Sequence, residues 1–148
     1  MKAGYLLAPH TPYADWGLLL LRLTFATQLI WGTQDNVFSW EQMLEFRDFL
    51  AAHGVPYPLL AAYLSVYAQF LAGLCWIAGL ATRLASLIMV INFIAALIIV
   101  HIGLPYEQNF PAINLLAVAL CLFLTGPGRF SLDSFLHGRL PAKGVFSA

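Results

Sequence analysis

The chain has 148 residues, of which 61% are hydrophobic and 9% are charged, and its formal net charge at pH 7 is zero. This length suits one domain over residues 1–148, but it offers too little polar surface to enclose long apolar segments in a water-soluble fold. A neutral chain also lacks the basic field that attracts nucleic acid. The composition therefore indicates an integral membrane protein that lies in the lipid bilayer and has no nucleic-acid partner.

The first apolar segment covers about residues 16–32, with the sequence WGLLLLRLTFATQLIWG. Trp16 and Trp31 bracket it, as aromatic side chains do at the two interfaces of a membrane helix. The segment is short and carries Arg22 and Gln28 in its interior. We expect it to be the first membrane crossing.

The longest connection follows, and it mixes acidic with apolar residues. Ser39 stands three residues before Gln42, which is the spacing of a capping box at a helix N-terminus. Trp40, Met43 and Leu44 then recur at helical intervals. The pattern predicts a short amphipathic helix over residues 39–52 that covers the outer end of the bundle and buries Trp40 and Leu44.

Two longer apolar runs, residues 59–80 and 84–104, flank Arg83, the single charged residue between Asp48 and Glu107. Each run has about 20 residues, enough to cross a hydrocarbon core of about 30 Å as a helix. The break between them is too short to cross anything, so the chain must turn back at residues 79–83. Because the runs lack the alternation of barrel strands, we expect two antiparallel helical crossings at about 58–80 and 83–104.

Pro105 ends this hairpin, and a fourth crossing is expected at about 109–125, with Pro111 in its first turn. Residues 126–128, Gly-Pro-Gly, stop that helix, and an amphipathic tail follows at the interface. The predicted fold class is therefore all-α: an integral membrane four-helix bundle with a short amphipathic helix in the first outer connection.

An even number of crossings places both termini on one side of the membrane. Arginine and lysine predominate on that side, and the outer side has one arginine together with most of the acids. This bias predicts a multi-pass protein of the cytoplasmic membrane with both termini cytoplasmic. The basic residues on the side of the termini are Lys2, Arg83, Arg129, Arg139 and Lys143, and the charged residues of the outer side are Arg47, Asp35, Glu41, Glu45, Asp48 and Glu107.

Arg22 needs a partner, because a charge inside a membrane helix costs a few kcal/mol. It lies six positions after Trp16, and no membrane segment supplies an acid. We expect a structural tie between Arg22 and Asp133 in the tail, which closes the cytoplasmic end of the bundle. The alternatives are pairing with Asp15, or a site for an anion or a lipid head group.

Each predicted crossing carries a carboxamide, and two interpretations stay open. Carboxamides between packed helices hydrogen-bond across the interface. They also suit a polar pocket for a head group such as a quinone ring, with tyrosines in its wall. The residues of this hypothetical ligand site are Arg22, Gln28, Tyr67, Gln69, Asn92 and Asn114.

Two further sets of residues have side chains that could form a site. Cys75 and Cys121 lie in apolar runs, where burial makes a thiol inert, so small packing residues are favoured over a redox pair. His53, His101 and Glu107 reach the outer mouth and have side chains that transition metals accept. Their spacing matches no metal motif, and such histidines more often bond loop carbonyls, so no metal is assigned.

Three segments together resemble the DoxX family of small bacterial and archaeal membrane proteins. They are LLLLRLTFATQLIWG in the first helix, AQFLAGLCWIAGLATRLASL across the hairpin, and GPGRFSLDS after the fourth helix. The family pattern has an arginine in the first helix, matched by Arg22. Many members have a glutamate where Gln69 stands and a lysine after the glycine matched by Gly32, and this chain has neither.

The resemblance implies a four-helix protein of the bacterial or archaeal inner membrane, an accessory or anchoring subunit that assists a quinone-linked redox system. One alternative is a binder of a quinone or another small lipid-like ligand in the bundle core. Another is a quinone-dependent oxidoreductase subunit. The chain shows no nucleotide, flavin or haem motif and no catalytic motif, so the cofactor expected is at most a quinone, and the partners are a second protein or a second copy.

Overall fold

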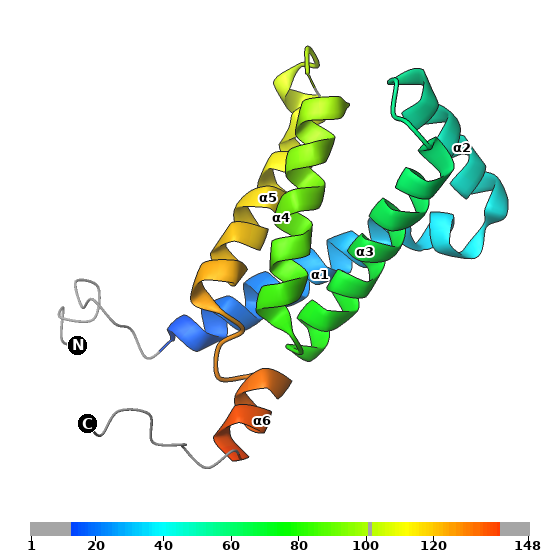
Figure 1. The fold of residues 1–148 in the computed structure, drawn as a ribbon. Coiled ribbons are helices and arrows are strands. Elements are labelled where there is room, and N and C mark those ends of the chain that lie inside the picture. The colour runs from blue at the N-terminus through cyan, green and yellow to red at the C-terminus, as the bar shows by residue number, and fades with distance from the viewer. Residues whose placement is uncertain (1–12, 101, 140–148) are drawn as a thin grey trace, which may run out of the picture.

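The computed structural model describes residues 13–100 and 102–139, and these residues form helices and no strand (Figure 1). The helical fold class predicted from the sequence is thus confirmed. The helices are α1 (Ala14–Phe38), α2 (Trp40–Ala52), α3 (Pro58–Ala78), α4 (Thr82–Ile99), α5 (Tyr106–Thr125) and α6 (Leu132–Arg139).

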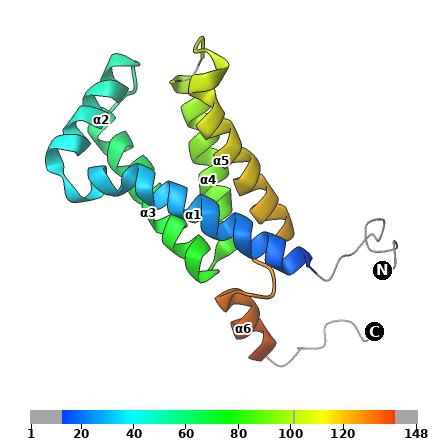
Figure 2. The ribbon, with the colours of Figure 1, turned by 180° about the vertical axis from the view of Figure 1, so that it is seen from behind.

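The long helices form two arms that diverge from the α3–α4 turn (Figure 1). In one arm α5 lies along α4, and in the other α2 lies against α3. Helix α1 crosses both arms and packs mainly along α3, as the view from behind shows (Figure 2). Helix α6 lies below the turn (Figure 1). We call this end of the molecule, where α1 begins and α5 ends, the turn end.

Helices α3, α4 and α5 are long and apolar enough to cross a membrane, with mean hydropathies of 1.6, 2.2 and 1.6. This supports a multi-pass membrane protein. Helix α1 has 25 residues but is not one of these three, because Arg22 and Gln28 lower its hydropathy. That α1 also crosses the membrane therefore stays a prediction. The helix runs obliquely across both arms and extends over much of the molecule (Figure 2).

Several helices begin or end at other residues than the predicted crossings do. Helix α1 continues past residue 32 to Phe38, and the Thr33 hydroxyl is satisfied inside the helix by donating to the Leu29 carbonyl oxygen at 2.7 Å. Helix α4 ends at Ile99, before residue 104. Helix α5 begins at Tyr106, so Pro111 lies inside the helix rather than in its first turn. The missing N–H of Pro111 leaves the carbonyl four residues earlier without its helical partner.

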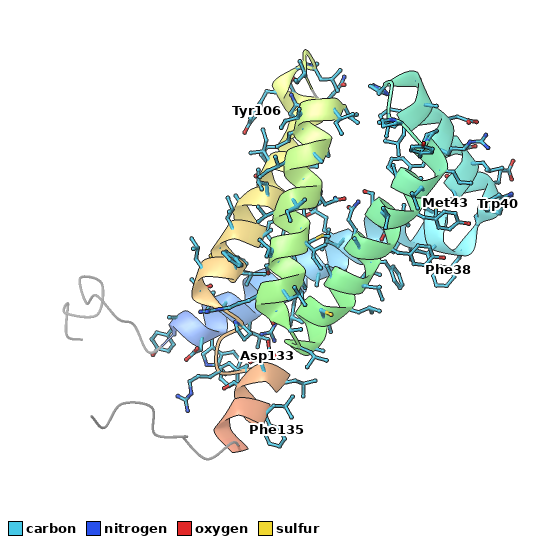
Figure 3. All side chains as sticks on the ribbon, viewed as in Figure 1. Phe38, Trp40, Met43, Tyr106, Asp133 and Phe135 are labelled. Carbon is cyan, nitrogen blue, oxygen red and sulfur yellow. The ribbon has the colours of Figure 1, made fainter. Side chains whose placement is uncertain are left out.

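The amphipathic helix α2 is confirmed, and Ser39 caps it by accepting a hydrogen bond from the Gln42 N–H at 3.4 Å. Met43 and Leu50, seven residues apart on one helix face, are buried against α3. The expected burial of Trp40 was wrong: its side chain, labelled in Figure 3, is 57% exposed, although its ring centroid lies 6.3 Å from that of Tyr63 in α3. Leu44 is half-buried, because the face that contacts α3 is centred on the Met43 row.

The main core lies near the turn end, where the arms meet. Trp76 of α3 is fully buried there, and its indole N–H donates to the Ser86 hydroxyl of α4 at 3.0 Å. Ala26 and Leu29 of α1 pack into the same core. This packing fixes the two arms at the turn end, while they separate towards the other end (Figure 1).

Candidate functional site

The structure has two candidate sites that contain buried or half-buried polar side chains. The first is formed by a buried arginine at the turn end. Arg22 is 1% exposed. Its two terminal nitrogens donate to the carbonyl oxygens of Pro127 and Phe130, at 2.5 and 2.6 Å. These carbonyls lie between α5 and α6, where no helix supplies them with a backbone partner. The segment after α5 therefore solvates the guanidinium in place of water.

Asp133 completes this junction from the start of α6. Its carboxylate accepts hydrogen bonds from the N–H groups of Ala81 at 2.8 Å and Thr82 at 3.0 Å, and its own N–H donates to the Gly79 carbonyl oxygen at 2.9 Å. Figure 3 shows Asp133 below the α3–α4 turn. A carboxylate that binds the first N–H groups of a helix caps it and complements its dipole. Asp133 thus caps α4.

The tail therefore contacts Arg22, but the hydrogen bonds come from carbonyl oxygens rather than from the expected carboxylate. The Asp133 charge still interacts favourably with the Arg22 guanidinium. The competing candidate, Asp15, accepts a hydrogen bond from the Arg129 N–H at 3.0 Å and so also binds the tail. Both carboxylates accept hydrogen bonds from backbone N–H groups, Asp133 at the start of α4 and Asp15 in the segment after α5, which the sequence did not indicate.

The second candidate site is a cleft of about 630 Å³ between the two arms. Phe46 and Phe49 of α2 border it on one side and Ile99 of α4 on the other. Most of the lining is aliphatic or aromatic, and no charged residue lines the cleft in the described part of the chain. Leu64 and Ile91 line it while remaining 65% and 62% exposed, so the cleft is open at its edge.

A chain of hydrogen bonds crosses this apolar cleft from α3 to α4. The Gln69 amide nitrogen donates to the Ser65 hydroxyl at 3.1 Å, and this hydroxyl donates to the Asn92 amide oxygen at 2.9 Å. All three residues line the cleft and are half-buried. We call Ser65, Gln69 and Asn92 the polar trio. It links the two arms and is also the polar part of the cleft wall.

The structure separates the six residues that the sequence grouped as one ligand site. Gln69 and Asn92 lie together in the cleft, but Arg22 lies in the turn-end junction. Tyr67 is 40% exposed, stacks on Tyr63 with ring centroids 5.8 Å apart and does not line the cleft. Gln28 is exposed on α1 and Asn114 is half-buried on α5, and both also lie outside the cleft lining.

The remaining candidates form no cluster. His53 Nδ1 lies 2.8 Å from the carbonyl oxygen of Phe49, which belongs to the last turn of α2 rather than to a loop. Glu107 lies in the first turn of α5, and His101 lies outside the described residues. Among residues 13–100 and 102–139, no three histidine, cysteine or acidic side chains are grouped as a metal site. Cys75 and Cys121 are free, half-buried thiols, and Cys75 packs against the main core.

Sequence reasoning missed the contribution of α2 to the cleft. Phe46 and Phe49 lie three residues apart, so they share a helix face, and this spacing was the available signal. It also missed the carbonyls that bind Arg22, because backbone groups carry no mark in the sequence. The Gly-Pro-Gly at residues 126–128 was the sign that the helix ends there and frees carbonyls.

These features define a multi-pass helical membrane protein with a cleft between its arms and a buried arginine at one end. The chain belongs to the DoxX family, whose family model matches residues 17–102. That range includes Arg22 and the whole polar trio. The chain is also similar to inner membrane protein YphA of Escherichia coli strain K12, with 28% identity over 138 residues, covering 82% of this chain and 95% of that protein. No solved structure gives a significant match.

Proposed function

We propose that this inner-membrane DoxX family protein binds a quinone or another small lipid-like ligand in the cleft, as an accessory subunit of a quinone-linked redox system. The observation that carries the proposal is the polar trio in an otherwise apolar cleft. Ligand sites of this kind have volumes of about 300–1,000 Å³, apolar walls and a few placed polar groups. The redox context rests on the resemblance described above.

The openness of the cleft supports a ligand that arrives through the membrane. Leu64 and Ile91 form its edge and are exposed on helices that are apolar enough to cross a bilayer. A ligand with an apolar tail can enter sideways from the lipid without crossing water. The two phenylalanines of α2, Phe46 and Phe49, then offer aromatic surface to a flat ring.

An accessory role fits this arrangement better than catalysis by the chain alone. Redox chemistry on a quinone requires a second redox group, and a partner protein would supply it. The alternative function, a quinone-dependent oxidoreductase subunit, places the same ligand in the same cleft. The two differ in whether electrons reach the bound ligand from the partner.

Asn92→Leu tests ligand binding. We expect the wild-type chain, purified in mild detergent, to retain a lipid-like molecule in near-stoichiometric amount by mass spectrometry. Asn92→Leu should reduce retention about tenfold, because it removes one hydrogen bond of about 1–1.5 kcal/mol from a site shielded from water. Asn114→Leu is the matched control, because Asn114 is a half-buried carboxamide outside the cleft, and it should retain the ligand. Equal retention in all three proteins would argue against the cleft as the site.

We further propose that the turn end faces the cytoplasm. Arg83 and Arg129 lie at this end, and Glu107 lies at the opposite end with α2. A green fluorescent protein fused after Ala148 should therefore fluoresce, whereas alkaline phosphatase inserted after Gly54 should be active. Active phosphatase fused after Ala148 would show the opposite orientation.

A further inference from the structure

We infer that the cleft selects an uncharged ligand whose head group carries a hydroxyl, a group that both donates and accepts a hydrogen bond. This inference rests on the proposed ligand-binding function and specifies the chemistry of the head group. It is drawn from the donors and acceptors of the polar trio.

The polar trio leaves one donor atom and one acceptor atom without any hydrogen bond. The chain of bonds runs from the Gln69 amide nitrogen through the Ser65 hydroxyl to the Asn92 amide oxygen. The Asn92 amide nitrogen then remains as a donor and the Gln69 amide oxygen as an acceptor, and neither has a hydrogen bond within the described residues. Turning both amides over reverses the direction of the chain but again leaves one donor and one acceptor.

These two groups are accessible from the cleft. In the described part of the chain, the side-chain polar atoms that are fully buried without a partner are Arg22 Nε and Thr82 Oγ1, both at the turn end. The free amide atoms of Gln69 and Asn92 are not sealed in this way, and both residues line the cleft. Because an unpaired amide group in hydrocarbon is strongly unfavourable, an occupant of the cleft is expected to pair with them.

A hydroxyl satisfies both groups, whereas a carbonyl satisfies the donor alone. The oxidised quinone offers only carbonyl acceptors to the trio, and the reduced quinol offers hydroxyls. An anionic head group is disfavoured, because no charged residue lines the described cleft to offset its loss of hydration. Quinols and lipid alcohols share the required chemistry, so the class of ligand is a neutral amphipathic molecule with a hydroxyl.

The test compares matched probes on the full chain in phosphatidylcholine nanodiscs under anaerobic conditions. One pair is decylubiquinol and decylubiquinone, and the second is 1-dodecanol and its methyl ether. We expect the hydroxyl-bearing member of at least one pair to bind about tenfold more tightly, the effect of one added hydrogen bond. Preference within the quinone pair assigns a quinol, and preference within the alcohol pair alone assigns a lipid alcohol.

Substitutions in the polar trio link this preference to the residues. Gln69→Met or Asn92→Leu, whichever removes the unused acceptor, should bring the affinity ratio close to one, and Asn114→Leu should leave it unchanged. Equal binding within both pairs, or a ratio that neither trio substitution alters, would overturn the inference while leaving ligand binding intact. Failure of every probe to bind would instead overturn the proposed function itself.

Discussion

Arg22→Gln is expected to lower the free energy of unfolding by about 3 kcal/mol or more, since it removes two hydrogen bonds from a charged donor, each contributing about 1.5–3 kcal/mol. The guanidinium connects α1 to the carbonyl oxygens of Pro127 and Phe130. Glutamine is shorter and cannot reach both oxygens, so at least one buried carbonyl loses its partner. The measurement is reversible denaturation in detergent, followed by circular dichroism.

Arg83→Gln is the matched control for this substitution. Arg83 is exposed, and its hydrogen bond to the Leu124 carbonyl oxygen is long, at 3.4 Å. Its loss should change the free energy of unfolding by no more than about 0.5 kcal/mol, the usual range for exposed polar contacts. Equal losses from the two substitutions would mean that the junction does not depend on the buried guanidinium.

Gly79→Ala is expected to be similarly severe, for a steric reason. Gly79 has a φ of +65°, and a Cβ there would lie 2.5 Å from the Ser131 Cβ and 2.8 Å from the Ser131 Cα. The left-handed conformation alone costs a non-glycine residue about 1–2 kcal/mol. The clash must also push the segment before α6 away from the turn, so the total loss should exceed about 3 kcal/mol.

Gly54→Ala separates the two contributions. Gly54 also has a positive φ, +73°, but nothing lies within 4 Å of its virtual Cβ. The loss there should be limited to about 1–2 kcal/mol. If Gly54→Ala and Gly79→Ala lower the free energy of unfolding equally in the same detergent assay, the predicted clash with Ser131 does not contribute to the loss at Gly79.

Arg22→Gln and Gly79→Ala both probe the junction at the turn end, which the sequence indicated only in part. The cost of a charge in an apolar helix showed that Arg22 needs a partner, and the Gly-Pro-Gly at residues 126–128 showed where the chain turns back. The partner itself was not predictable, because peptide carbonyls are present at every residue. Which of them face Arg22 depends on how α1 crosses the turn, and this is a property of the packed fold.

The helices themselves were largely predictable, since apolar runs of membrane-spanning length leave few alternatives. The ends of the helices were less predictable: helix α1 continues through Asp35 and Asn36 to meet α2, where the Asn36 amide nitrogen donates to the Gln42 carbonyl oxygen at 2.9 Å. The sequence wrongly placed Trp40 on the buried face of α2, because a short helix with several apolar residues can turn any of them towards its neighbour. The contacts with α3 determine which of these residues are buried.

The candidate ligand site shows the same division between what sequence indicates and what it does not. Carboxamides at residues 69 and 92 were recognised as polar groups in apolar helices, and the structure brings them together through Ser65. The cleft beside them arises from the angle between α3 and α4, and no periodicity reports that angle. Gln28, Tyr67 and Asn114 were grouped with them on chemistry alone, and their positions lie outside the cleft lining.

The central claim, that the cleft holds a quinone-like or other lipid-like ligand, is tested most directly by photo-crosslinking in nanodiscs with an azido-quinone that carries a short apolar tail. We expect labelling of the cleft-lining residues of α3 and α4, and we expect unmodified quinol to displace it. These residues are Ala61, Leu64, Ser65, Ala68, Gln69, Ile88, Ile91, Asn92, Phe93, Ala95, Ala96 and Ile99. Asn92→Leu should reduce this labelling, whereas Asn114→Leu should not. Labelling spread over exposed positions outside the cleft, such as Leu74 and Leu124, and unaffected by the competitor would contradict the claim.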